Sequence, residues 1–197
     1  MRDASQTKNL IITKAISLFN TKGYRATSLS DITKATGMTK GAIYGNFNNK
    51  DAVAVASFEY ASQKVLGDLR ERIKSAPTAP DKLKAILSYY DSYLEEPPIE
   101  GGCPVINTSV EADDEHPQLR EKAVATIQMI KDSLKKIILR GIDENQLRSG
   151  IDVDLYANMF YATISGALLI ARVEGESHSF DQVRNGLEMQ INAITLN

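Results

Sequence analysis

The sequence predicts an all-α protein of about nine helices. Three observations support this fold class. Apolar residues recur with the three- and four-residue spacing of a helix face, as in Ile11, Ala15, Leu18 and Phe19. Residues that begin and end helices bracket these segments, and no segment shows the strict apolar–polar alternation of a half-buried strand.

The first four helices follow from their boundary residues. The first is expected over residues 7–22, ending at Gly23, and the second begins at Ser28, where Asp31 gives part of a capping box, and closes at Gly37. The third is expected to begin at Thr39 and to end near residue 47. The fourth, capped by Asn49, is expected to continue to about residue 75.

Proline- and glycine-rich breaks at residues 76–80 and 96–102 separate the later helices. We expect these helices at about 81–95, 103–113, 117–144, 152–175 and 180–194. Residues 155–171 are strongly apolar, but polar residues interrupt them and they fall short of the roughly 20 residues of a membrane span. A helix that is apolar on nearly all sides is instead expected to be buried.

Charge is distributed unevenly along the chain. The net charge is −2, yet residues 1–50 contain eight basic and two acidic residues, which leaves 15 basic and 23 acidic residues for the rest. A basic N-terminal segment on an acidic body indicates that the first part contacts phosphate. The single cysteine excludes an internal disulfide and is compatible with a reducing compartment. The N-terminus lacks the pattern of a signal peptide.

Residues 28–47 have the pattern of a helix-turn-helix. Two short helices flank a tight turn at Gly37 and Met38, and the second contains small residues that allow close approach to a major groove. The residues expected to pack inward are Leu29, Ile32, Ala35, Met38, Ile43 and Phe47. Those expected to face outward are Thr39, Lys40, Tyr44 and Asn46.

Four runs of residues near the helix-turn-helix form a recognisable pattern. They are Gly23-Tyr24, Thr27-Ser28-Leu29-Ser30-Asp31-Ile32, Ala35-Thr36-Gly37-Met38-Thr39-Lys40-Gly41-Ala42-Ile43-Tyr44 and Phe47-Asn48-Asn49-Lys50-Asp51. This pattern resembles the DNA-binding domain of the TetR family of bacterial regulators. The resemblance covers about residues 7–60. It implies a DNA-binding domain at residues 1–50 and a ligand-sensing, dimerising helical domain at 51–197. The DNA-binding positions that it implies are Thr27 or Ser28, Thr39, Lys40, Gly41, Tyr44, Asn46 and Lys50. Gly45 stands where many members carry a larger residue, so base reading is expected to rest on Thr39, Lys40 and Asn46.

Three further runs lie between residues 101 and 120. They are Gly101-Gly102-Cys103-Pro104-Val105-Ile106-Asn107, Glu111-Ala112-Asp113-Asp114 and Pro117-Gln118-Leu119-Arg120. Together they resemble one branch of TetR sensor domains. The resemblance implies a ligand cavity among the fifth to eighth helices. Its candidate lining residues are Tyr89, Tyr90, Tyr93, Cys103, Phe160 and Tyr161, although each of the aromatic residues could equally be plain core. Cys103, at a predicted helix start, could sense electrophiles or oxidants, or could simply pack the sixth helix.

The resemblance also implies a cytoplasmic, nucleoid-associated bacterial repressor that acts as a homodimer on a palindromic operator and is released by a small molecule. Dimerisation is expected through residues 152–174 and 180–194, with Gly166 and Ala167 allowing close approach and Leu168, Leu169, Ile170, Leu187, Ile191 and Ile194 in contact. We expect no cofactor, no metal and no membrane partner. A helical enzyme is the first alternative, but His116 and His178 lack metal-ligand spacing and no nucleophile motif is present. The second alternative is a DNA-binding protein without a ligand.

Overall fold

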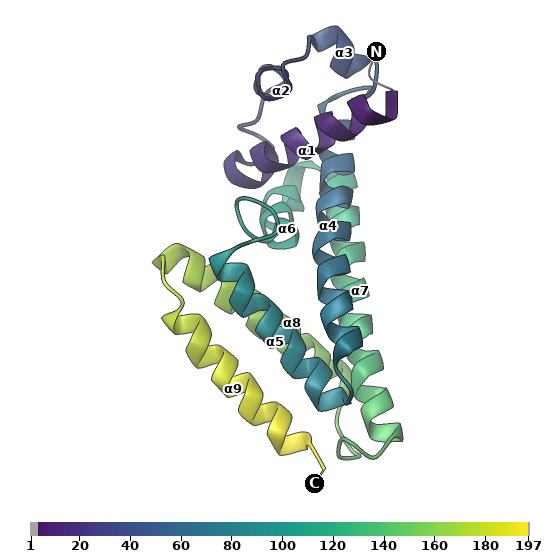
Figure 1. Cartoon of the computed structure of the whole chain (residues 1–197), viewed down its shortest axis with the longest axis vertical. Coiled ribbons are helices and arrows are strands. Elements are labelled where there is room, and N and C mark those ends of the chain that lie inside the picture. Colours follow the sequence, from purple (N-terminus) through teal and green to yellow (C-terminus); the bar gives the residue numbers. More distant parts are fainter. Residues whose placement is uncertain (1–3, 197) are drawn as a thin grey trace. The chain divides into compact units, whose positions relative to one another are not determined.

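The computed structural model describes residues 4–196, except for the side chains of residues 113–115. This part of the chain forms nine helices and, apart from an isolated bridge between Leu147 and Thr195, no β-structure. The helices are α1 (Ala4–Lys22), α2 (Leu29–Thr36), α3 (Lys40–Tyr44), α4 (Lys50–Ser75), α5 (Ala79–Glu95), α6 (Pro104–Glu115), α7 (Pro117–Asp143), α8 (Val153–Glu174) and α9 (His178–Ile194) (Figure 1). The predicted all-α class is therefore confirmed.

The chain divides into two compact units, and the division differs from the predicted boundary at residue 50. Unit 1 comprises residues 1–65 and 97–126, and unit 2 comprises residues 66–96 and 127–197. The reason is that α4 and α7 are continuous helices that each contribute to both units, while α6 packs against α1 in unit 1.

Helices α1, α2 and α3 enclose the first core of unit 1. Ile11, Ile32, Ile43 and Phe47 are buried there together, and Leu29 and Met38 pack partly against them. The predicted inward set is correct except for Ala35, which is exposed. Leu29, Ile32 and Thr36 form the inner face of α2, and Ala35 lies beyond the edge of that stripe.

Short-range hydrogen bonds fix the ends of α2 and α3. Ser28 and Asp31 form a complete capping box, and Gly37 ends α2 in the left-handed region with φ 69°, a conformation that glycine adopts without steric cost. The Thr39 hydroxyl caps α3 by accepting the Ala42 amide. Helix α3 is shorter than predicted, because it ends at Tyr44, with Gly45 as its C-cap, rather than near residue 47.

The rest of unit 1 is a second core between α4, α6 and the start of α7. Tyr24, Phe58, Ala112, Leu119 and Ala123 are buried in it. Figure 1 shows α6 beside α1, and the two helices are in contact. The sensor-domain sequence around residue 104 therefore folds onto the DNA-binding segment.

Unit 2 is built on α5, α8 and α9, which run side by side (Figure 1). Ile138 of α7 and Leu147 are fully buried against Ala79 at one end. The Gln146 side chain accepts a hydrogen bond from the Ala79 amide, and Leu196 donates its amide to the Gln146 carbonyl. These bonds hold the α7–α8 turn and the end of α9 together.

One side of α8 is buried and the other is exposed, so this chain alone does not bury the helix on all sides. The buried residues on α8 are Ala157, Phe160, Ile164, Ala167, Leu168 and Ala171. By length and composition alone α8 could cross a membrane, and 28% of its most apolar 18-residue stretch is buried. A large part of its apolar surface is thus left uncovered by this chain.

Candidate DNA-binding surface and effector cavity

The residues predicted to contact bases lie in and beside one short helix, α3. Thr39, Lys40 and Gly41 are exposed at its start, and the side chain of Tyr44 is 51% exposed at its end. Asn46 is half-buried and donates its side-chain amide to the Ala42 carbonyl at 2.8 Å, which holds the amide against the helix. The buried Ile43 anchors this helix from behind, so its polar face is presented to solvent.

The two candidate phosphate contacts before α2 are placed differently. The Thr27 side chain is fully buried, and its hydroxyl donates to the Gly23 carbonyl at 2.7 Å. The phosphate contact was expected of Thr27 or Ser28, and the burial of Thr27 leaves Ser28 as the accessible candidate. Ser28 is exposed, and its hydroxyl both accepts from the Asp31 amide and donates to the Asp31 carboxylate. The Ser28 hydroxyl and the Ser28 backbone amide both donate to the Asp31 carboxylate, and these two hydrogen bonds lower the pKa of Asp31 to about 2.

Lys50 has a structural role in addition to the predicted phosphate contact, which stays a prediction. Its ammonium donates to the carbonyls of Tyr24 and Thr27 at 2.8 and 2.9 Å and lies 4.0 Å from the centre of the Tyr24 ring. Burial lowers its pKa. The first residue of α4 therefore fastens the turn between α1 and α2.

A group of polar side chains that the sequence reasoning missed joins α6 to the DNA-binding helices. Asn20, at the end of α1, donates to the carbonyls of Glu100 and Gly102 at 2.7 and 2.8 Å. Asn107 of α6 donates to the Asn20 side-chain oxygen and to the Gly101 carbonyl, both at 2.9 Å. Gly101 has φ 93°, and a Cβ there would lie 2.6 Å from the Asn20 carbonyl oxygen, so this close approach requires glycine.

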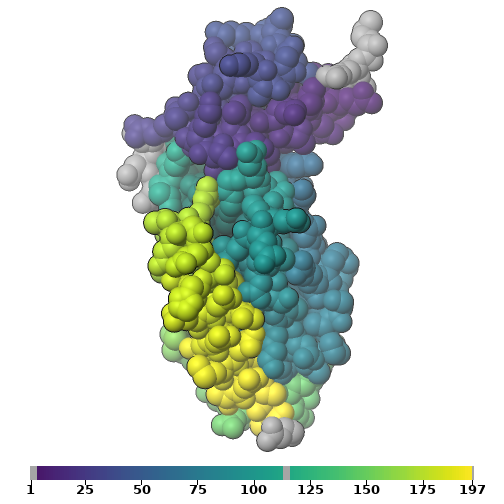
Figure 2. All heavy atoms as spheres, turned by 60° about the vertical axis from the view of Figure 1, so that its left-hand side comes forward, coloured from purple at the N-terminus to yellow at the C-terminus, as the bar shows by residue number. Residues whose placement is uncertain are grey.

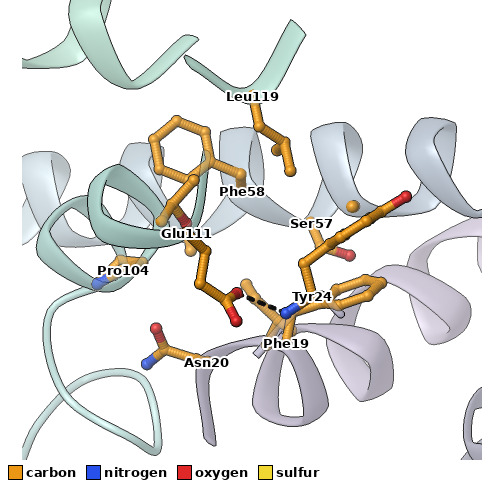
Figure 3. A pocket seen from close by; sticks show the side chains of 12 residues that line it. Phe19, Asn20, Tyr24, Ser57, Phe58, Pro104, Glu111 and Leu119 are labelled. Atoms are coloured by element: carbon orange, nitrogen blue, oxygen red, sulfur yellow. Dashed lines mark hydrogen bonds between the residues drawn. The ribbon is translucent and has the colours of Figure 1, made fainter. Parts of the chain in front are cut away.

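Glu111 makes the second connection, between α6 and the turn that follows α1. Its carboxylate accepts the Tyr24 amide at 2.5 Å, as Figure 3 shows. Burial raises the pKa of Glu111, against the opposing charges of His116, Lys50 and Arg25. The Tyr24 ring packs against the His116 ring at 3.9 Å between centroids, and its hydroxyl bonds to Asp51.

The cavity beside Glu111 measures about 30 Å³, which leaves room for about one or two water molecules. It is therefore too small for an organic effector. Asn107 and Glu111 belong to the segment that resembles a TetR sensor domain, but nothing in the local pattern indicated that they bind α1 and the turn after it.

Unit 2 contains a larger cavity of about 220 Å³. Of the predicted ligand-binding residues, Phe160 and Tyr161 line it together with Tyr90. Tyr89 and Tyr93 do not; they are buried in a cluster of tyrosine rings 5.3–5.8 Å apart. The three tyrosines share one helix, and only Tyr90 faces the cavity.

Cys103 is not among the residues that line this cavity, and it belongs to unit 1. It is half-buried at the N-cap of α6, and its thiol makes no capping hydrogen bond there. Its reactivity stays a prediction. Among the described residues, no group of three or more His, Cys, Asp and Glu side chains is placed to hold a metal ion.

The exposed sides of α8 and α9 form an apolar face. We define this α8–α9 face by Leu155, Met159, Leu169, Ile170, Val173 and Met189, all of which are exposed. Space is open in front of Gly166, where an added Cβ would meet no atom within 4 Å. Figure 2 shows α9, in yellow, at the surface of unit 2. Of the predicted interface residues, Leu169 and Ile170 are on this face. Leu168, Leu187 and Ile191 are buried within unit 2, so their predicted contact with a second copy is wrong.

Comparisons with known proteins agree with this architecture. Residues 11–56 match the family model "Bacterial regulatory proteins, tetR family", and residues 79–187 match "Tetracyclin repressor-like, C-terminal domain". The fatty acid metabolism regulator protein of Bacillus subtilis is 25% identical over 93% of both chains.

Two solved structures are also similar. A TetR transcriptional regulator from Chloroflexus aurantiacus superposes with a TM-score of 0.96 at 34% identity, covering 100% of both chains. A TetR family regulator from Cytophaga hutchinsonii gives 0.92 at 38% identity, covering 100% of this chain and 98% of that one. The chain belongs to the TetR family and is a ligand-responsive, DNA-binding transcription regulator.

Proposed function

We propose that two copies of this chain form a repressor that binds a palindromic operator in the bacterial cytoplasm and leaves it when a small molecule binds unit 2. The observation that carries the proposal is the exposed polar face of α3, anchored from behind by Ile43. In this proposal Thr39, Lys40 and Asn46 read bases from the major groove. Ser28, Tyr44 and Lys50 hold the flanking phosphates, which set the register of the helix. Gly41 allows the helix to lie close to the groove.

The α8–α9 face is the proposed dimer interface. Its α8 members Leu155, Met159, Leu169 and Val173, with Gly166 between them, follow one another at intervals of four, seven, three and four residues. That spacing produces one continuous stripe along a helix. Lipid is a poorer occupant than a second copy, because the opposite side of α8 is buried against α5 and α9 rather than free on all sides.

The cavity in unit 2 is the proposed effector site. Leu66, Leu69 and Ile73 of α4 line this cavity. The first residue of the same helix is Lys50, whose ammonium binds the turn between α1 and α2. A ligand that favours a different position of α4 therefore changes the placement of the DNA-binding helices. Release from DNA requires that the ligand bind the released conformer more tightly.

The first experiment is selection of operator DNA with the full-length protein from random duplexes. We expect inverted repeats whose half-sites are centred about one helical turn, or a multiple of it, apart. Lys40→Ala is expected to relax the sequence preference of the selected duplexes. Lys34 is an exposed lysine on α2, so Lys34→Ala is the matched control and should leave that preference unchanged. Failure to enrich any inverted repeat would overturn the proposal.

A further inference from the structure

The cavity of unit 2 combines an apolar wall with positive charge. The apolar lining residues are Leu66, Leu69, Ile73, Ile86, Met129, Ile130, Leu134, Ile137, Phe160 and Ile164. The ionisable side chains in its lining, apart from two tyrosines, are Arg70, Lys74 and Lys136, and no carboxylate is among the lining residues. All three cations are exposed, whereas Leu134, Phe160 and Ile164 are buried. The positive charges therefore lie where the cavity meets solvent.

This local charge is opposite to that of the unit around it. Residues 66–96 and 127–197 together contain twelve basic and fifteen acidic residues. Arg70 and Lys74 are four residues apart on α4, which places them on the same face of the helix, and Lys136 comes from α7. Lys74 pairs with the exposed Glu71 at 3.0 Å, but within the described part of the chain neither Arg70 nor Lys136 forms an ion pair.

We propose that the effector is an amphipathic anion, with an apolar body inside the cavity and a carboxylate or phosphate head at Arg70, Lys74 and Lys136. The inference rests on the proposed function, since it assigns a chemical class to the effector of that site. Burial of the apolar body supplies affinity, and the cations supply discrimination. A cationic amphiphile of the same length meets three like charges at the same position.

The volume sets the size of the apolar body. A cavity of about 150 Å³ holds a benzene molecule. In proportion, a cavity of about 220 Å³ encloses about nine carbon atoms. A ten-carbon chain with an anionic head is therefore a suitable probe.

The experiment measures the affinity of the full-length protein for four probes by isothermal titration calorimetry. The probes are decanoate, decyl phosphate, decan-1-ol and decylammonium, which share one chain and differ in the head. We expect one or both anions to bind at least ten-fold more tightly than the alcohol and the ammonium. Decanoate and decyl phosphate also distinguish a carboxylate head from a phosphate head.

Variants place the bound probe in the cavity. Arg70→Gln and Lys136→Gln are each expected to weaken binding of the preferred anion roughly two- to five-fold, as for an ion pair near the surface. Lys131→Gln, which alters a lysine of α7 outside the lining, is the matched control and should leave affinity unchanged. Ser133→Trp adds a large ring at an exposed lining position and should abolish binding of the anion.

Three results would overturn the inference. Binding of decan-1-ol or decylammonium as tight as that of the anions, and blocked by Ser133→Trp, would refute an anionic effector but leave the cavity as the effector site. Anion binding unaffected by Ser133→Trp would place the ligand elsewhere. Failure of both anions to bind would refute the ligand class, whereas the selection of operator DNA would still report separately on the repressor function.

Discussion

Substitution of Ile170 by glutamate tests the proposed dimer most directly. The Ile170 side chain is 47% exposed on the α8–α9 face, four residues from Gly166, where space is open. Because about half of the side chain is already exposed, Ile170→Glu should fold as a monomer. Leu139→Glu is the matched control, since Leu139 is an aliphatic residue of α7 that is 50% exposed outside that face.

The size of the effect follows from the exposed fraction. Complete burial of such a side chain stabilises by about 1.5–3 kcal/mol, so covering the remaining half contributes about 1 kcal/mol per copy. A two-fold dimer contains the residue twice, which gives about 2 kcal/mol, or about a 30-fold change in Kd. Desolvation of two carboxylates at the interface adds to this cost. We therefore expect the dimer Kd to rise at least about 30-fold.

Sedimentation equilibrium across a concentration series measures this constant. Wild type and Leu139→Glu should dimerise alike, and Ile170→Glu should dissociate at concentrations where both remain dimeric. Circular dichroism confirms that all three proteins are folded. A dimer constant of Ile170→Glu within a factor of three of wild type would refute the assigned interface, as would equal dissociation of Leu139→Glu.

Four further predictions concern unit 1. In salt-titrated operator binding, Tyr44→Phe should weaken binding to all duplexes by a similar factor, whereas Lys40→Ala should change which sequence is preferred. Burial raises the pKa of Glu111, so the folded state binds the carboxyl proton more tightly than the unfolded state does. The stability of the fold should therefore fall as pH rises from about 4.5 through the folded pKa. Glu111→Gln should flatten this pH dependence in thermal unfolding. Asn107→Ala should lower the free energy of unfolding by about 1–3 kcal/mol in urea titrations, because it leaves the Asn20 side-chain oxygen and the Gly101 carbonyl without the Asn107 donor. If Cys103 senses electrophiles, Cys103→Ser should keep its operator affinity and lose release by a quinone, and equal release of both proteins would eliminate that role.

Helix boundaries were predictable where a few adjacent residues determine them. Ser28 and Asp31 satisfy each other within one turn, Gly37 supplies the left-handed closing residue, and the Asn49 side chain accepts the Ala52 amide at the start of α4. These interactions involve residues three or four positions apart, so the sequence displays them directly. The exposed polar face of α3 was predictable for the same reason, since α3 is short and locally determined.

The connections of α6 to the DNA-binding helices depend on long-range packing. Asn107 and Asn20 are 87 residues apart, as are Glu111 and Tyr24. An asparagine in a helix has many possible partners, and only the packed fold selects one. Likewise, helical periodicity did not reveal that Tyr90 faces the cavity while Tyr89 and Tyr93 pack against each other and against Tyr90. The direction of each ring depends on which neighbouring helix it meets.

The position of α4 limits how an effector can act. This helix of 26 residues begins with Lys50, which binds the carbonyls of the turn before α2, and its second half lines the cavity with Leu66, Leu69 and Ile73. At 1.5 Å per residue, its 26 residues correspond to a length of about 39 Å. Occupancy of the cavity alone does not release DNA, because a ligand that binds both conformers equally shifts neither. Reversal of a 99:1 preference for the DNA-binding conformer needs about a 10⁴-fold difference in affinity. In this scheme the lining residues of α4 must change their contacts with the ligand between the two conformers, whereas Lys50 transmits the change without touching the ligand.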